Sequence, residues 1–82
     1  MNLYILSNMD YKDHDDYSMC VVAAPDAETA RYMHPDGFVW DATPDRWASR
    51  LYSYWCRPYR VAVEYIGTAR PDAVVGVLAT GR

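Results

Sequence analysis

The sequence predicts an α+β domain, built from a small, mainly antiparallel sheet of three to four strands with one or two helices packed on one face. Three observations support this class. Short apolar runs rich in β-branched and aromatic residues predict strands. Two helix-start signals lie between these runs. The length of 82 residues, of which 51% are hydrophobic and 23% charged, suits one folded core, so we expect a single compact domain over residues 1–82.

The strand-forming runs are short and bounded by polar residues, glycine or proline. They lie at 2–8, 19–24, 60–69 and 76–80, with a further brief run at 38–40. The first two can pair antiparallel across the polar stretch 10–18, which predicts an exposed loop. In the third run, alternation places Val61, Val63 and Tyr65 on one face of the sheet.

Two local signals predict helices. Asp26 stands at an N-cap position and predicts a helix over 26–34. Its inward-facing side chains follow helical spacing: Ala27, Ala30 and Met33 or His34. Thr43-Pro44-Asp45 opens a second helix, because threonine caps it and proline fits the first helical position. We expect this helix to end at Arg57-Pro58, with an apolar face formed by Trp47, Leu51 and Trp55.

Charge is divided unevenly along the chain. Residues 1–45 hold nine acidic and two basic side chains, a net of −7, whereas residues 46–82 hold six basic and two acidic ones, a net of +4. The fold either lets the two halves neutralise each other or displays an acidic face and a basic face. The overall charge of −3 does not favour generic binding of nucleic acid.

The acidic loop is the first candidate binding surface. Four aspartates and two tyrosines lie within residues 10–17, but no register supplies the ligand order and glycine of an EF-hand calcium loop. Two interpretations stay open: a solvated loop, or a recognition surface whose carboxylates pair with arginines that normally hold phosphate. The predicted partner-binding residues are acidic or tyrosine side chains of the first half: Asp10, Tyr11, Asp13, Asp15, Asp16, Tyr17, Asp26, Glu28 and Asp36.

The segment 46–60 is the alternative surface, because tyrosines and tryptophans alternate there with four arginines. Aromatic and guanidinium groups in alternation suit single-stranded nucleic acid, and they suit protein interfaces equally well. The alternative partner-binding residues are the polar-aromatic ones not assigned to the core: Arg50, Tyr54, Arg57 and Tyr59.

No catalytic, cofactor or metal motif is present in the sequence. It has no glycine-rich phosphate loop, serine nucleophile elbow or His-Glu-x-x-His pattern, so we expect neither an enzyme nor a cofactor. The two histidines lack metal-ligand spacing with the two cysteines. Cys20 and Cys56 are too few for a disulfide scaffold and fit a reducing cytoplasm, and Cys20 is expected to be a buried, inert thiol. No apolar run is long enough to span a membrane, and 1–9 lacks the features of a signal peptide.

Two segments resemble small proteins of unknown function encoded by phages and prophages: Val22–Gly37 and Val63–Thr80. The shared motifs are structural, and the segment 46–60 departs from them. Phage accessory regions also encode anti-CRISPR proteins. The resemblance therefore implies an inhibitor, monomeric or homodimeric, in the cytoplasm of the bacterial host. It would bind a CRISPR surveillance complex, type I Cascade-like, and block DNA recognition through an acidic, DNA-mimicking surface. The alternative is a small module that binds nucleic acid or a host protein through 46–60, without a role in defence.

Overall fold

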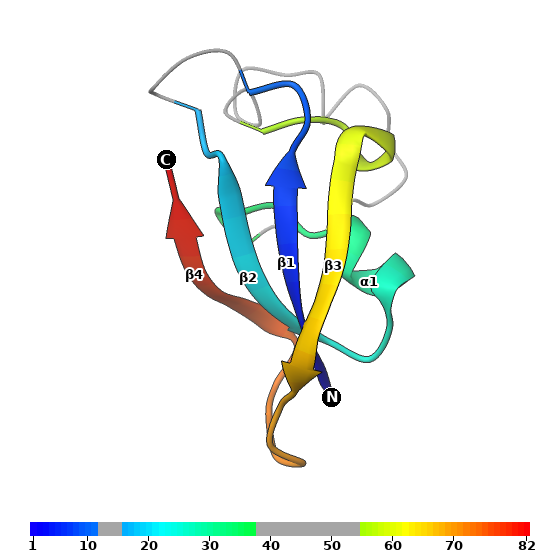
Figure 1. Cartoon of the computed structure of the whole chain (residues 1–82). Coiled ribbons are helices and arrows are strands. Elements are labelled where there is room, and N and C mark those ends of the chain that lie inside the picture. Colours follow the sequence, from blue (N-terminus) through cyan, green and yellow to red (C-terminus); the bar gives the residue numbers. More distant parts are fainter. Residues whose placement is uncertain (12–15, 38–54) are drawn as a thin grey trace.

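The computed structural model describes residues 1–11, 16–37 and 55–82 (Figure 1). Four strands form one antiparallel sheet: β1 (Asn2–Asn8), β2 (Met19–Ala24), β3 (Val61–Thr68) and β4 (Gly76–Gly81). The described residues also contain one α-helix, α1 (Ala27–Arg31), and one 3₁₀ turn, η2 (Pro58–Arg60). The α+β class and the four antiparallel strands are confirmed. The packing of one or two helices on one face stays a prediction.

The strands lie in the order β3-β1-β2-β4, so the first two strands of the chain form the centre of the sheet. β3 pairs with β1 and β4 pairs with β2, each antiparallel. β3 and β4 follow each other in the chain but form opposite edges (Figure 1). Their connection, residues 69–75, passes the end of the sheet where β1 begins, and the Ala69 N–H donates to the Met1 carbonyl at 2.9 Å.

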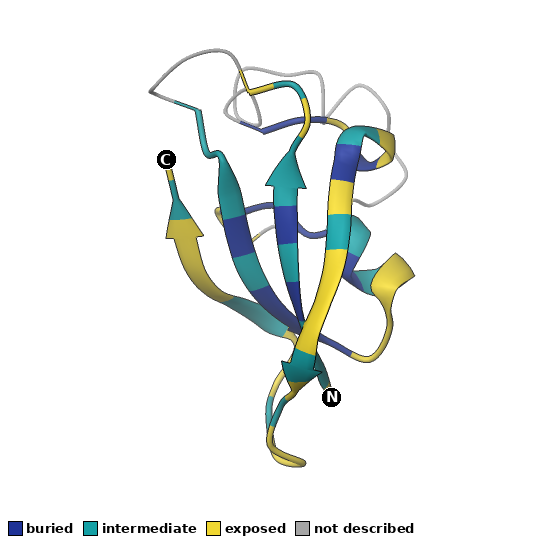
Figure 2. Cartoon of the chain, in the orientation of Figure 1, coloured by how far each residue is buried: buried dark blue, intermediate teal, exposed yellow. Residues whose placement is uncertain are grey.

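The core lies on one face of the sheet. Leu6 stands opposite Cys20 on one side and Val63 on the other, and the next inward position, Tyr4, stands opposite Val22. Alternation therefore places these side chains together, and Figure 2 shows the resulting buried bands on β1 and β2. Buried side chains from outside the sheet complete this cluster: Ala30, Met33, Trp55 and Cys56. Because the four strands share one inward face, their register decides which side chains form the core.

The first helix is shorter than predicted. Instead of spanning 26–34, α1 ends at Arg31, and the Met33 N–H donates to the Ala30 carbonyl at 3.0 Å in a tighter turn. This turn carries Met33 and His34 into the core, where both are buried. Ala27, which was expected to face inward, is exposed.

The predicted strand at 38–40 and residues 43–54 of the second predicted helix lie outside the described residues. The last residues of that helix, 55–57, are described and are not helical, so its predicted end at Arg57 is wrong. Trp55 is buried as expected. None of the helices in the described part of the chain is long and apolar enough to cross a membrane.

Candidate functional site

Asn8 holds the two ends of the acidic loop together. Its backbone N–H donates to the Ser18 carbonyl at 3.0 Å, and its side-chain amide donates to the Tyr17 carbonyl at 3.1 Å. Its amide oxygen accepts a 2.8 Å hydrogen bond from the Asp10 N–H. These three bonds join the last residue of β1 to both sides of the loop. One asparagine therefore ties both described ends of the loop to the end of β1.

Asp10 connects the acidic half of the chain to the basic half. Its carboxylate accepts a 3.0 Å hydrogen bond from the Arg60 guanidinium, fifty residues away. The backbone reinforces this contact, because the Met9 N–H donates to the Arg60 carbonyl at 3.2 Å. Both side chains of the pair are close to half exposed, so solvent screens the attraction and the pair contributes little net stability. Together the two contacts show that η2 lies beside the first residues of the acidic loop.

Tyr17 is the best-connected aromatic side chain of this region. Its hydroxyl donates to the Asp36 carboxylate at 2.6 Å. The Arg82 guanidinium lies 4.8 Å from the centre of its ring, which is a cation–π geometry. The ring also meets His34 edge to face, with centroids 6.5 Å apart. Tyr17 thus joins the loop to the residues after α1 and to the C-terminal arginine.

The structure brings five of the nine predicted residues to one region, which we call the loop end of the sheet: Asp10, Tyr11, Asp16, Tyr17 and Asp36. Tyr11 is 44% exposed there. Asp13 and Asp15 lie outside the described residues. Asp26 lies elsewhere, because it follows the far end of β2, and a strand of this length spans roughly 20 Å. Glu28 lies with it on α1.

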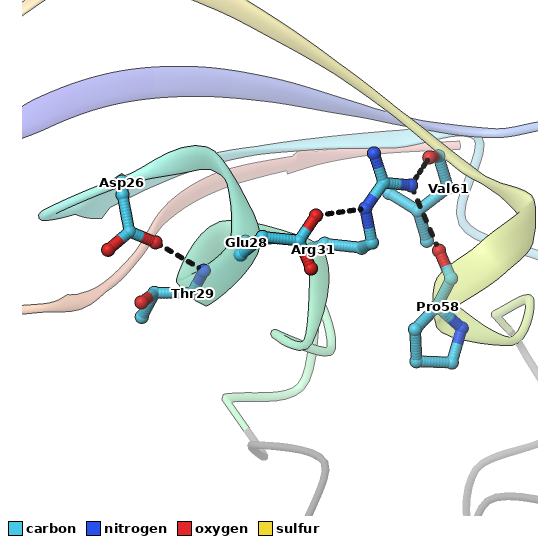
Figure 3. Close-up of polar contacts among 6 residues, drawn as sticks. All are labelled: Asp26, Glu28, Thr29, Arg31, Pro58 and Val61. Atoms are coloured by element: carbon cyan, nitrogen blue, oxygen red, sulfur yellow. Dashed lines mark hydrogen bonds and ion pairs between the residues drawn. The ribbon is translucent and has the colours of Figure 1, made fainter.

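The two acidic residues of α1 have local structural roles (Figure 3). The Asp26 carboxylate caps the helix by accepting the Thr29 N–H at 2.7 Å, and this hydrogen bond lowers the pKa of Asp26 below its usual 3.8. Glu28 pairs with Arg31 at 3.4 Å. The same arginine donates to the carbonyls of Val61 at 2.7 Å and Pro58 at 3.3 Å. α1 is thereby tied to η2 and the start of β3.

The structure describes two of the four residues predicted for the alternative binding surface. Arg57 and Tyr59 are exposed, Tyr59 to 74%, and they flank the first residue of η2. Arg50 and Tyr54 lie outside the described residues. Because Arg60 of η2 pairs with Asp10, the two surfaces predicted as alternatives adjoin each other at this contact.

The thiols and His34 lie in the core. Burial raises the pKa of Cys20 to about 12, with a smaller contribution from Cys56, and burial raises that of Cys56 to about 11. Both thiols are therefore protonated at neutral pH, which agrees with the expectation for Cys20. His34, which was expected either on the inward face of the first helix or at its C-terminus, is fully buried, and its Nδ1 accepts the Asp36 N–H at 3.0 Å. Across 1–11, 16–37 and 55–82, no three His, Cys, Asp or Glu side chains are grouped to hold a metal ion.

No family model, no curated protein and no solved structure matches the chain. The resemblance to small phage and prophage proteins therefore rests on Val22–Gly37 and Val63–Thr80 alone.

Proposed function

We propose that the protein is an inhibitor that binds a bacterial CRISPR surveillance complex, type I Cascade-like, in the host cytoplasm. It acts by binding rather than by catalysis, and its acidic loop occupies a basic surface that otherwise receives DNA. One observation carries the proposal: the half-exposed Asp10 carboxylate and the exposed Tyr11 follow Asn8, whose side-chain hydrogen bonds reach both ends of the loop. Asp13 and Asp15 add two further carboxylates to the same loop in the sequence.

These hydrogen bonds matter because a partner then binds the loop without having to order its two ends first. A charge-assisted hydrogen bond between a carboxylate and an arginine contributes about 1.5–3 kcal/mol where water is excluded. Three or four such hydrogen bonds, with stacking on Tyr11, support binding in roughly the nanomolar range. The same charges steer the inhibitor toward a basic surface, so its association should slow as salt is added.

The internal pair of Asp10 and Arg60 does not oppose this role. An exposed ion pair contributes only about 0–1 kcal/mol, so Asp10 can exchange Arg60 for a partner's arginine at small cost. The released Arg60 would then be free to meet an acidic group of the partner.

The first test is phage plating on strains with active CRISPR systems of several subtypes, with and without the protein expressed. We expect plating to be restored against a type I system. The variant Asp10→Asn/Asp13→Asn/Asp15→Asn/Asp16→Asn should lose this effect. Two double variants that remove the same number of charges test whether the position of the charges matters. Asp10→Asn/Asp16→Asn removes two carboxylates from the loop, and Glu64→Gln/Asp72→Asn removes two exposed carboxylates elsewhere. Equal inhibition by both double variants and the parent contradicts the proposed mechanism.

A second candidate function is supported by the exposure of Tyr59 on η2. In this version the protein is a small module that binds nucleic acid or a host protein through the Arg/aromatic segment 46–60. It predicts that Arg57→Ala and Tyr59→Ala abolish partner capture while the loop aspartates can be changed freely. The opposite result, with binding abolished only in the aspartate variants, excludes this version.

A further inference from the structure

The two edges of the sheet differ in how they are protected. At the β3 edge, the guanidinium of Arg31 donates to the Val61 carbonyl, and the strand carries the charged Glu64 at its centre. β4 carries no charged side chain from Gly76 to Gly81, and no described residue pairs with its outer side. Exposed apolar side chains accompany it: Val74 (81%), Val75 (41%) and Leu78 (60%). Figure 2 shows the exposed stretch along this strand.

Proteins usually protect an edge strand with charge, proline, a bulge or a covering element, because its free N–H and C=O groups accept another strand. β4 has only one of these devices. Its pairing with β2 shifts register between Val21 and Val22, so Leu78 is an extra residue on the edge. This bulge leaves an apolar side chain in solvent instead of placing a charge there. The β4 edge is therefore built to accept a strand more readily than the β3 edge.

We propose that the β4 edge pairs antiparallel with the β4 strand of a second copy, which gives a continuous eight-stranded sheet across a two-fold axis. A second copy fits this edge because the pairing of a strand with itself is self-complementary, and an uncharged strand meets no like charge in its copy. A charged strand from another protein would find no opposite charge here. In an antiparallel pair, the start of one strand lies beside the end of the other, so Val74 and Val75 approach the partner's Gly81.

The size of the interface determines how stable the dimer should be. Two paired strands of six residues bury less than the ~800 Å² per partner of a standard stable interface. The dimer should therefore be weak and concentration-dependent, with a Kd on the order of 10–1,000 μM. This inference does not depend on the proposed function.

Analytical ultracentrifugation of the full chain from about 10 μM to 1 mM tests the proposal across the expected range of Kd. We expect a monomer–dimer equilibrium. Leu78→Lys places a charge on the β4 edge and should weaken the dimer at least about tenfold. Ile66→Lys is the matched control, because Ile66 is 44% exposed on β3 and the change likewise replaces an exposed aliphatic side chain by lysine. It should dimerise like the parent. Circular dichroism checks that both variants fold.

Hydrogen exchange on the unmodified chain gives a second readout that does not depend on the variants folding. Amide protection in 76–81 should rise with protein concentration, while protection in 61–68 stays constant. A monomer throughout the concentration range overturns the proposal. So does an equal response of the two lysine variants, or a rise in protection at β3 instead of β4.

Discussion

Two acidic regions of the molecule, the loop end of the sheet and the start of α1, differ in the partners that their carboxylates bind. At α1 the partners are local: Asp26 accepts the Thr29 N–H, and Glu28 pairs with Arg31. At the loop end they are distant: Asp10 meets Arg60, and Asp36 accepts the Tyr17 hydroxyl. Local contacts stabilise one helical turn. Distant contacts join the two described ends of the loop to η2 and to the residues after α1.

The distant contacts at the loop end also join the acidic and basic halves of the chain. The sequence left two arrangements open, one with neutralised halves and one with separate acidic and basic faces. Asp10 and Arg60 bring the two halves into direct contact, 3.0 Å apart, and Arg82 from the C-terminus lies over Tyr17. At the loop end, therefore, the halves meet. Any partner of the acidic loop approaches arginines of this chain as well as its carboxylates.

The largest expected loss of folding stability comes from Asn8→Ala. The change removes the side-chain bonds to the Asp10 N–H and the Tyr17 carbonyl, so the free energy of unfolding should fall by about 1–3 kcal/mol. Urea unfolding measures it. Asn2→Ala is the control from the other end of β1, where the side-chain amide makes only long hydrogen bonds of 3.3 and 3.4 Å. An equal decrease in both variants would show that Asn8 has no special role in holding the loop.

A smaller loss of folding stability is expected from Tyr17→Phe. The ring stays beside His34 and Arg82, but the 2.6 Å hydrogen bond to Asp36 is removed, at a cost of about 0.5–1.5 kcal/mol. Tyr65→Phe is the matched control, because its hydroxyl meets the exposed Thr68 hydroxyl at 3.1 Å. Thermal unfolding of the two variants should show the larger decrease for Tyr17. Unchanged stability in Tyr17→Phe would show that the hydrogen bond between Tyr17 and Asp36 does not stabilise the fold.

The smallest effect is a pH dependence at α1. The pKa of Asp26 is lower in the folded state than in the unfolded one, mainly because the carboxylate accepts the Thr29 N–H. The charged form therefore adds stability above the unfolded pKa of 3.8, and this contribution disappears as pH falls through the lower folded value. Asp26→Asn keeps a capping side chain without the titration. Its stability deficit relative to the parent should be present at pH 6 and shrink toward pH 3. A deficit independent of pH contradicts this role.

The central strands could be predicted from the sequence because their signal is local. The runs 2–8 and 19–24 have apolar centres, Leu3–Leu6 and Cys20–Ala23, and both were predicted with the bounds that the structure shows. Strand order could not be predicted. The seven residues between β3 and β4 suit a hairpin as well as the crossing that occurs, and only packing against β1 and β2 decides between them.

The candidate site was predictable in composition but not in arrangement. Four of its five residues stand together within 10–17, whereas Asp36, Arg60 and Arg82 reach them only through the fold. The sequence only partly predicted the burial of His34, because helical spacing allowed either Met33 or His34 to face inward and both are buried. A histidine after a short helix is usually exposed, and this one is buried because the chain turns at Arg31 and places its ring between Tyr17 and Trp55.

The most direct test of the proposed binding surface is the affinity for a purified type I surveillance complex, measured for two double variants that each remove two carboxylates. Asp10→Asn/Asp16→Asn acts at the loop end, and Asp26→Asn/Glu28→Gln acts at α1. We expect the loop variant to bind at least about tenfold more weakly than the parent, because each removed carboxylate deletes a charge-assisted hydrogen bond to the partner. The α1 variant should bind like the parent. Unchanged binding of the loop variant, or equal weakening in both, would contradict the proposal.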